Sequence, residues 1–78
     1  MKLNNNLRRF RFEKGEISQE ELARSVGVSR QTIHSIEKGK FVPSTLLALR
    51  MAKFFNTSVE ELFSISEDDK LNKTFAYM

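Results

Sequence analysis

The sequence predicts an all-α fold of five short helices, and two kinds of local signal support this prediction. Serines at four positions each precede a stretch in which apolar residues recur at helical spacing, and a serine hydroxyl often caps a helix N-terminus. Glycines stand where three of the stretches end, and glycine readily takes the positive φ that ends a helix. Short loops between the stretches are typical of a compact helical domain.

The expected helices can be placed in order from these signals. Ser18 and Ser58 are each followed three residues later by a glutamate, Glu21 and Glu61, and this spacing is typical of a capping box. Pro43 is suited to the start of the fourth helix, because its φ is already fixed near the helical value. The expected helices therefore occupy about residues 5 or 6 to 14, 18 to 27, 29 to 38, 43 to 55 and 58 to 63.

The two ends of the chain carry a different pattern. Residues 63–66 alternate apolar and polar side chains, as do residues 1–3, so the two fragments could pair as a short antiparallel ribbon. Residues 67–78 are more polar, although apolar side chains recur there near helical spacing. We therefore expect one domain over residues 1–66 and a C-terminal tail over residues 67–78 that is either disordered or a short docked helix.

The composition excludes several classes of protein. The chain of 78 residues has no cysteine and one histidine, His34, and its carboxylates do not cluster with that histidine. No disulfide and no metal site are therefore expected, and no cofactor is expected either. No nucleophile with an adjacent base and no phosphate-binding glycine loop can be assembled, so we do not expect an enzyme. No apolar run approaches the roughly 18 residues of a membrane span, and residues 1–10 lack a signal peptide's apolar core. The protein is expected to be cytoplasmic, without a membrane partner.

The charge is distributed unevenly along the chain. Residues 1–53 carry eleven lysines and arginines against five glutamates, whereas residues 54–78 carry two lysines against five acidic residues. This asymmetry favours one basic face that binds a polyanion, although ordinary solvated surface charge could also produce it.

Residues 19–38 form the most informative segment. Small, flexible and apolar residues occupy the positions that a helix-turn-helix corner requires, namely Ala23, Gly27, Val28, Ile33 and Ile36. Such a corner usually places its second helix in the major groove of DNA. The segment therefore predicts binding to double-stranded DNA.

Five segments in the same order and spacing carry a closer resemblance: Ile17–Ala23, Gly27–Ile33, Ile36–Lys40, Pro43–Ser44 and Ser58–Phe63. Over residues 7–63 the chain resembles the Cro and phage-repressor-like helix-turn-helix regulators, often called Xre-like, in their small stand-alone form. The resemblance implies a five-helix lambda-repressor-like fold. It also implies a sequence-specific transcriptional regulator, in particular a repressor that binds an inverted-repeat operator as a homodimer.

The resemblance places base contacts on the exposed side of the third helix, because Ile33 and Ile36 are needed for the core. Arginine can donate two hydrogen bonds to guanine, and glutamine can pair with adenine. The candidates for base contacts are Arg30, Gln31, His34 and Ser35.

Three of these candidates have an alternative interpretation. Arg30 could bind a phosphate instead of a base, and Gln31 could hold Gln19 in place. His34 could contact a base, a phosphate or only water.

Phosphate contacts are expected at the start of the second helix and around the end of the third. The family's glutamine at the position of Gln19 meets a phosphate there, and lysines beside a flexible glycine suit charge neutralisation. Thr32 could instead pack its methyl group near the backbone. The candidates for phosphate contacts are Gln19, Arg24, Ser29, Thr32, Lys38, Gly39 and Lys40, and the resemblance implies a structural ion pair between Arg11 and Glu37.

Two departures from the family pattern stand out. Glu16 and Ile17 both separate Gly15 from the serine cap, where many members have one residue, so the first loop is longer. In the fourth helix, apolar side chains stand where the family is usually polar or small, at Leu46 and Phe54, although Leu46 could also belong to the core. Unpartnered apolar residues on a small domain favour a protein contact. The candidates for the dimer contact are Phe54, Phe55, Val59, Phe63 and Ile65.

A different class of function remains open from the sequence. The acidic tail with Phe75 and Tyr77 could be a docking segment for a protein partner. The chain would then be a protein-binding antitoxin or regulatory partner.

Overall fold

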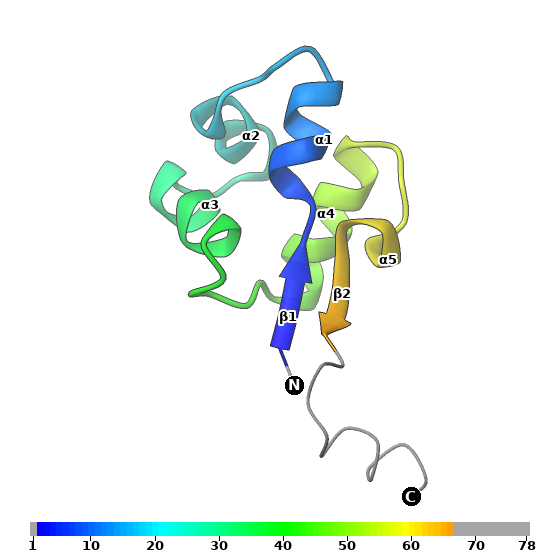
Figure 1. Cartoon of the computed structure of the whole chain (residues 1–78). Coiled ribbons are helices and arrows are strands. Elements are labelled where there is room, and N and C mark those ends of the chain that lie inside the picture. Colours follow the sequence, from blue (N-terminus) through cyan, green and yellow to red (C-terminus); the bar gives the residue numbers. More distant parts are fainter. Residues whose placement is uncertain (1, 67–78) are drawn as a thin grey trace, which may run out of the picture.

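The computed structural model describes residues 2–66, in which five helices and a two-stranded sheet follow one another (Figure 1). The predicted all-α architecture with a terminal ribbon is confirmed. The prediction of a disordered tail or a docked helix falls on residues 67–78, which lie outside the described residues. The elements in order are β1 (Lys2–Asn5), α1 (Leu7–Glu13), α2 (Gln19–Val26), α3 (Arg30–Glu37), α4 (Thr45–Phe54), α5 (Val59–Leu62) and β2 (Phe63–Ser66).

Four of the helices begin with the same local arrangement. In each, a serine in extended conformation precedes the helix, and its Oγ accepts a hydrogen bond from the backbone amide three residues later. At the start of α2, for example, the Glu21 amide donates to the Ser18 Oγ over 3.0 Å. These bonds satisfy one otherwise free amide per helix, which is typically worth about 1 kcal/mol. The caps are Ser18, Ser29, Ser44 and Ser58.

The longer loop between α1 and α2 is accommodated by two consecutive residues with positive φ. Gly15 has a φ of 97° and Glu16 a φ of 57°. The amides of both residues donate to the Phe12 carbonyl, and the Ile17 amide donates to the Arg11 carbonyl. The additional residue is therefore absorbed inside the loop, and α2 still begins directly after its serine cap.

Every helix contributes to one apolar core. Six large side chains are almost completely inaccessible to solvent, and together they come from all five helices. Burial of a side chain of this size typically contributes about 1.5–3 kcal/mol, so the core is the main source of stability. These side chains are Leu7, Leu22, Ile33, Ile36, Met51 and Leu62.

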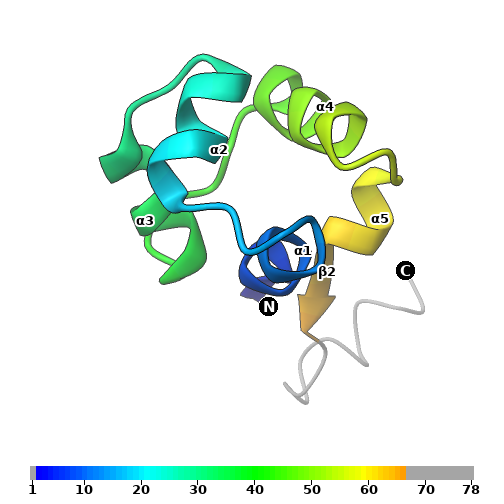
Figure 2. The ribbon, with the colours of Figure 1, turned by 90° about the horizontal axis from the view of Figure 1, so that it is seen from above.

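The ribbon joins the two ends of the described chain. β1 and β2 are antiparallel, with Lys2 opposite Ser66 and Asn5 opposite Phe63. In Figure 2, α2 and α3 lie on the left and α4 and α5 on the right, with α2 beside α4, while α1 and β2 lie below, between α3 and α5. In this view α3 lies at the edge of the part of the chain that the structure describes. None of the helices in residues 2–66 has the length and apolar character needed to cross a membrane.

Candidate nucleic-acid interface

The corner between α2 and α3 depends on a glycine. Gly27 has a φ of 82°, and the amides of Gly27 and Val28 both donate to the Ala23 carbonyl, at 2.9 and 3.0 Å. A Cβ at this position would lie 3.2 Å from a guanidinium nitrogen of Arg50. The backbone conformation therefore favours glycine, whereas the exposed arginine side chain could move away from a Cβ, and the turn fixes the angle at which α3 leaves α2.

The side of α3 that faces away from the core carries the predicted base contacts. Ile33 and Ile36 are buried, at 0% and 2% exposure. Arg30 and Gln31 are exposed at the first turn of the helix, and His34 and Ser35 are half-buried one turn later. Within residues 2–66, neither Arg30 nor Gln31 has a side-chain hydrogen bond or ion pair. Their donor groups are therefore available to an external molecule.

A nearly buried cluster fixes α3 against α1 and α2. The Arg11 guanidinium donates from Nε and Nη2 to the two carboxylate oxygens of Glu37, over 2.7 and 3.0 Å. Its Nη1 donates to the Ile17 carbonyl, and the Gln19 Nε2 donates to the Glu37 Oε1 over 3.0 Å. The two charged side chains are only 13% and 9% exposed. The residues that the resemblance paired therefore lie in a two-bond ion pair, and Glu37 also orients Gln19.

The alternative that Gln31 holds Gln19 is not what the structure shows. The Gln19 side-chain amide instead donates its hydrogen bond to the Glu37 carboxylate. Gln19 is nevertheless half-buried at the first position of α2, so part of its side chain faces solvent beside the helix N-terminus.

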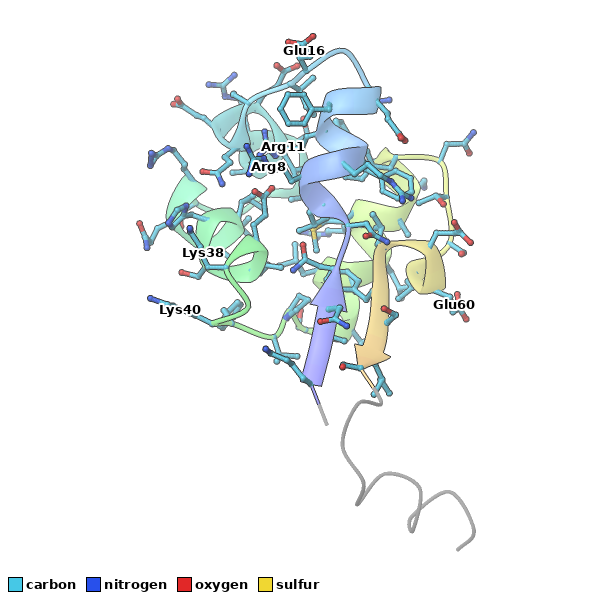
Figure 3. All side chains as sticks on the ribbon, in the orientation of Figure 1. Arg8, Arg11, Glu16, Lys38, Lys40 and Glu60 are labelled. Carbon is cyan, nitrogen blue, oxygen red and sulfur yellow. The ribbon has the colours of Figure 1, made fainter. Side chains whose placement is uncertain are left out.

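The loop after α3 has its backbone fixed and its lysines exposed. The Gly39 amide donates to the Ile36 carbonyl and the Lys40 amide to the Ser35 carbonyl, both over 2.9 Å, and Gly39 has a φ of 77°. Figure 3 shows Lys38 and Lys40 extending outward from the end of α3 and the loop that follows it. The loop therefore presents two cations from a defined backbone.

Three other candidates for phosphate contacts have local partners. The Ser29 Oγ caps α3 and lies 3.0 Å from the Thr32 Oγ1. Thr32 lines a hollow together with residues of α4, and Arg24 lines a second hollow on the α4 side, 3.8 Å from Glu20. Arg24 and Thr32 therefore lie toward α4, whereas Lys38 and Lys40 follow the end of α3 directly.

The five candidates for the dimer contact differ in how much surface they offer. Phe55 and Phe63 belong to the core of the single chain, at 9% and 8% exposure. Phe54 is half-buried, because its ring packs edge-on against Phe55 with centroids 5.0 Å apart. Val59 is also half-buried, and Ile65 is 55% exposed. Of the five residues, Ile65 offers the largest exposed fraction to a second molecule.

Sequence reasoning missed two side chains that matter for this surface. Asn5 connects the ribbon to α3, because its Nδ2 donates to the Ile36 carbonyl over 2.9 Å. Arg8 lies one turn before Arg11 on the same side of α1, and Figure 3 shows both directed toward α3. The spacing of three residues between Arg8 and Arg11 was the signal that could have revealed the second arginine.

The comparisons with known proteins agree with this geometry. A family model described as Helix-turn-helix (HTH_3) matches residues 7–62. The chain belongs to this HTH_3 family. It is 56% identical over 54 residues to an uncharacterized HTH-type transcriptional regulator, MJ0272, of Methanocaldococcus jannaschii, covering 69% of this chain and 80% of the relative. It is also 37% identical over 68 residues to the cryptic phage CTXphi transcriptional repressor RstR of Vibrio cholerae, covering 83% of this chain and 60% of the repressor.

Two solved structures of regulatory proteins are also similar to the HTH_3 chain. The restriction-modification controller protein C.AhdI of Aeromonas hydrophila is similar, with a TM-score of 0.64 and 33% identity over 70% of this chain and 78% of that one. The SOS-response transcriptional repressor LexA of Eubacterium rectale has a TM-score of 0.68 and 31% identity, covering 82% of this chain and 67% of that one. The HTH_3 protein is thus a transcriptional regulator with a DNA-binding, lambda-repressor-like fold, as the resemblance to Xre-like regulators implied.

Proposed function

We propose that this HTH_3 protein is a sequence-specific repressor that binds an inverted-repeat operator through α3 in the major groove. The observation that carries the proposal is the free side of α3, where Arg30 and Gln31 have no side-chain hydrogen bond or ion pair in residues 2–66. A guanidinium and a carboxamide can each make two hydrogen bonds to the edge of a base. Two similar proteins are named transcriptional repressors, which supports repression rather than activation.

The phosphate contacts in this proposal flank the base contacts. Lys38 and Lys40 follow α3 in the chain, and Gln19 lies at the N-terminus of α2 beside it. Contacts to the backbone on both sides of the groove would fix the register of α3 without adding sequence information. Because each neutralised phosphate releases counterions, affinity is expected to fall steeply as salt rises.

A homodimer completes the proposal. Two copies related by a two-fold axis would place their α3 helices about 34 Å apart, one turn of DNA. Ile65, which is 55% exposed on β2, is the residue of the predicted set best placed to meet a second copy. Phe54 and Val59 are half-buried and offer less surface.

Selection from a pool of random duplexes tests the proposal. The protein is incubated with the pool, bound duplexes are sequenced, and the best duplex is then titrated at two salt concentrations. We expect an inverted repeat with half-sites about one helical turn apart. Enrichment of no sequence, with equally weak binding to every duplex, would contradict the proposal.

A further inference from the structure

A hollow of about 510 Å³ lies between α1 and α3. Its lining includes Arg8 and Arg11 from α1, Gln19 from α2, and Arg30 and Glu37 from α3, with Lys38 following the helix. We call this space the basic hollow. It opens beside the base-contacting side of α3, because Arg30 belongs to both.

The charges that line the basic hollow do not balance. Glu37 is the one carboxylate in the lining, and both of its oxygens already accept bonds from Arg11. Arg8, Arg30 and Lys38 form no ion pair within residues 2–66. Three unneutralised cations around one open space raise the local positive potential, which favours an anion there.

Arg8 lines the basic hollow from α1 and lies where it can contact that anion. Its guanidinium carbon lies 5.8 Å from the centroid of the Phe12 ring, one turn further along α1. Figure 3 shows Arg8 directed from α1 toward α3, on the side where Lys38 is labelled. A guanidinium near a ring face still has its N–H groups, which lie in the guanidinium plane, available to a planar or tetrahedral anion.

We propose that the basic hollow holds a backbone phosphate of the bound DNA and that Arg8 contacts this phosphate from α1. The inference rests on the proposed function, because α3 must lie in the major groove for a phosphate to reach the hollow. It adds α1 to the DNA-binding surface and gives Arg8 a role that the helix-turn-helix segment alone does not predict.

Arg8→Ala tests the proposal, and Arg9→Ala is the matched control. Arg9 is the same residue type in the same helix, but it lies 3.7 Å from Glu13 and does not line the hollow. Dissociation constants for the selected duplex are measured at several salt concentrations. We expect Arg8→Ala to weaken binding and to reduce the slope of log K against log salt by about 0.9, the value for one phosphate contact. Arg9→Ala should leave the slope unchanged.

A duplex with single methylphosphonate substitutions locates the phosphate. At one position per half-site, the neutral linkage should weaken binding of the wild type and should have no further effect on Arg8→Ala. Thermal melting of each variant verifies that the fold is retained.

The outcomes separate the inference from the proposed function. A wild type that binds no duplex would remove both. A wild type that binds its inverted repeat, with equal slopes for Arg8→Ala and Arg9→Ala, would overturn only the role of Arg8. Titration with inorganic phosphate at constant ionic strength tests whether the hollow binds a free phosphate ion instead of a phosphate of the DNA. Saturable shifts of the Arg8 side-chain NMR signal, combined with unchanged DNA binding of Arg8→Ala, would overturn the DNA assignment in favour of a free phosphate ligand.

Discussion

At the scale of single residues, Glu16 is the clearest point of backbone strain. Its φ of 57° lies in the left-handed region, which generally costs a residue other than glycine about 1–3 kcal/mol. Its side chain is exposed, and Figure 3 shows it at the tip of the loop between α1 and α2. The additional loop residue is thus tolerated at some cost in stability.

Glu16→Gly should therefore raise the free energy of unfolding or leave it unchanged, with a gain of up to about 1 kcal/mol. The strain relieved is partly offset by the greater entropy that glycine has in the unfolded chain. The control is Glu20→Gly in the first turn of α2, where the same substitution should cost about 1 kcal/mol. Urea denaturation measures both variants, and equal losses would contradict the account of Glu16.

Individual residues also show where prediction from sequence stopped. The serine caps were predicted because each one bonds an amide three residues away, so the chemistry is local. The burial of Phe55 and Phe63 depends on how α4, α5 and the ribbon pack together, and the order of apolar residues does not specify that. The direction of Arg8 depends in the same way on how α1 lies against α3.

At the scale of the elements, the cluster around Glu37 connects three helices. Arg11 from α1, Glu37 from α3 and Gln19 from α2 are joined by direct hydrogen bonds. Since the two charges are mostly buried, removal of one partner leaves the other without compensation. The cluster thus fixes the orientation of α3 relative to α1 and α2.

Glu37→Leu alone should lower the free energy of unfolding by about 3 kcal/mol, the typical cost of an unpaired buried charge. The double variant Arg11→Met and Glu37→Leu should recover much of that loss, because no isolated charge remains. Urea denaturation of the two single variants and the double variant completes a double-mutant cycle. Additive losses from the two single variants would contradict a coupled pair.

At this scale the sequence was sufficient for most of the architecture. The alternation in residues 63–66 predicted β2, and the structure pairs it with β1 in an antiparallel ribbon. The first loop is longer than in many family members, and its two positive φ values explain why α2 keeps its cap. Hydrogen bonds over long separations were not foreseen, such as the one from Asn5 to Ile36 that connects β1 with α3.

At the scale of the whole molecule, the proposed dimer depends on surface that the single chain leaves uncovered. Ile65 is 55% exposed on β2, whereas Phe55 and Phe63 already fill the core. Among the five candidates for the dimer contact, Ile65 is therefore the residue whose surface a second copy could cover most.

Ile65→Glu should therefore shift the protein from dimer to monomer and weaken operator binding. Burial of a charge at a two-fold contact is unfavourable, and the charge would occur in both copies. The control is Ser64→Glu, because Ser64 is also exposed and precedes Ile65 in β2. Analytical ultracentrifugation measures the change, and identical sedimentation of both variants and the wild type would contradict the role of Ile65.

The central claim is that the exposed first turn of α3 selects the base sequence. Its most direct test is to titrate every single base-pair substitution of the selected half-site with the wild type, Gln31→Ala and the surface control Lys53→Ala. We predict that Gln31→Ala loses about 1–3 kcal/mol of discrimination at one base pair and keeps it elsewhere, as expected for one base contact. Lys53→Ala should behave as the wild type. A Gln31→Ala profile that matches the wild type at every base pair, with affinity unchanged, would contradict the claim.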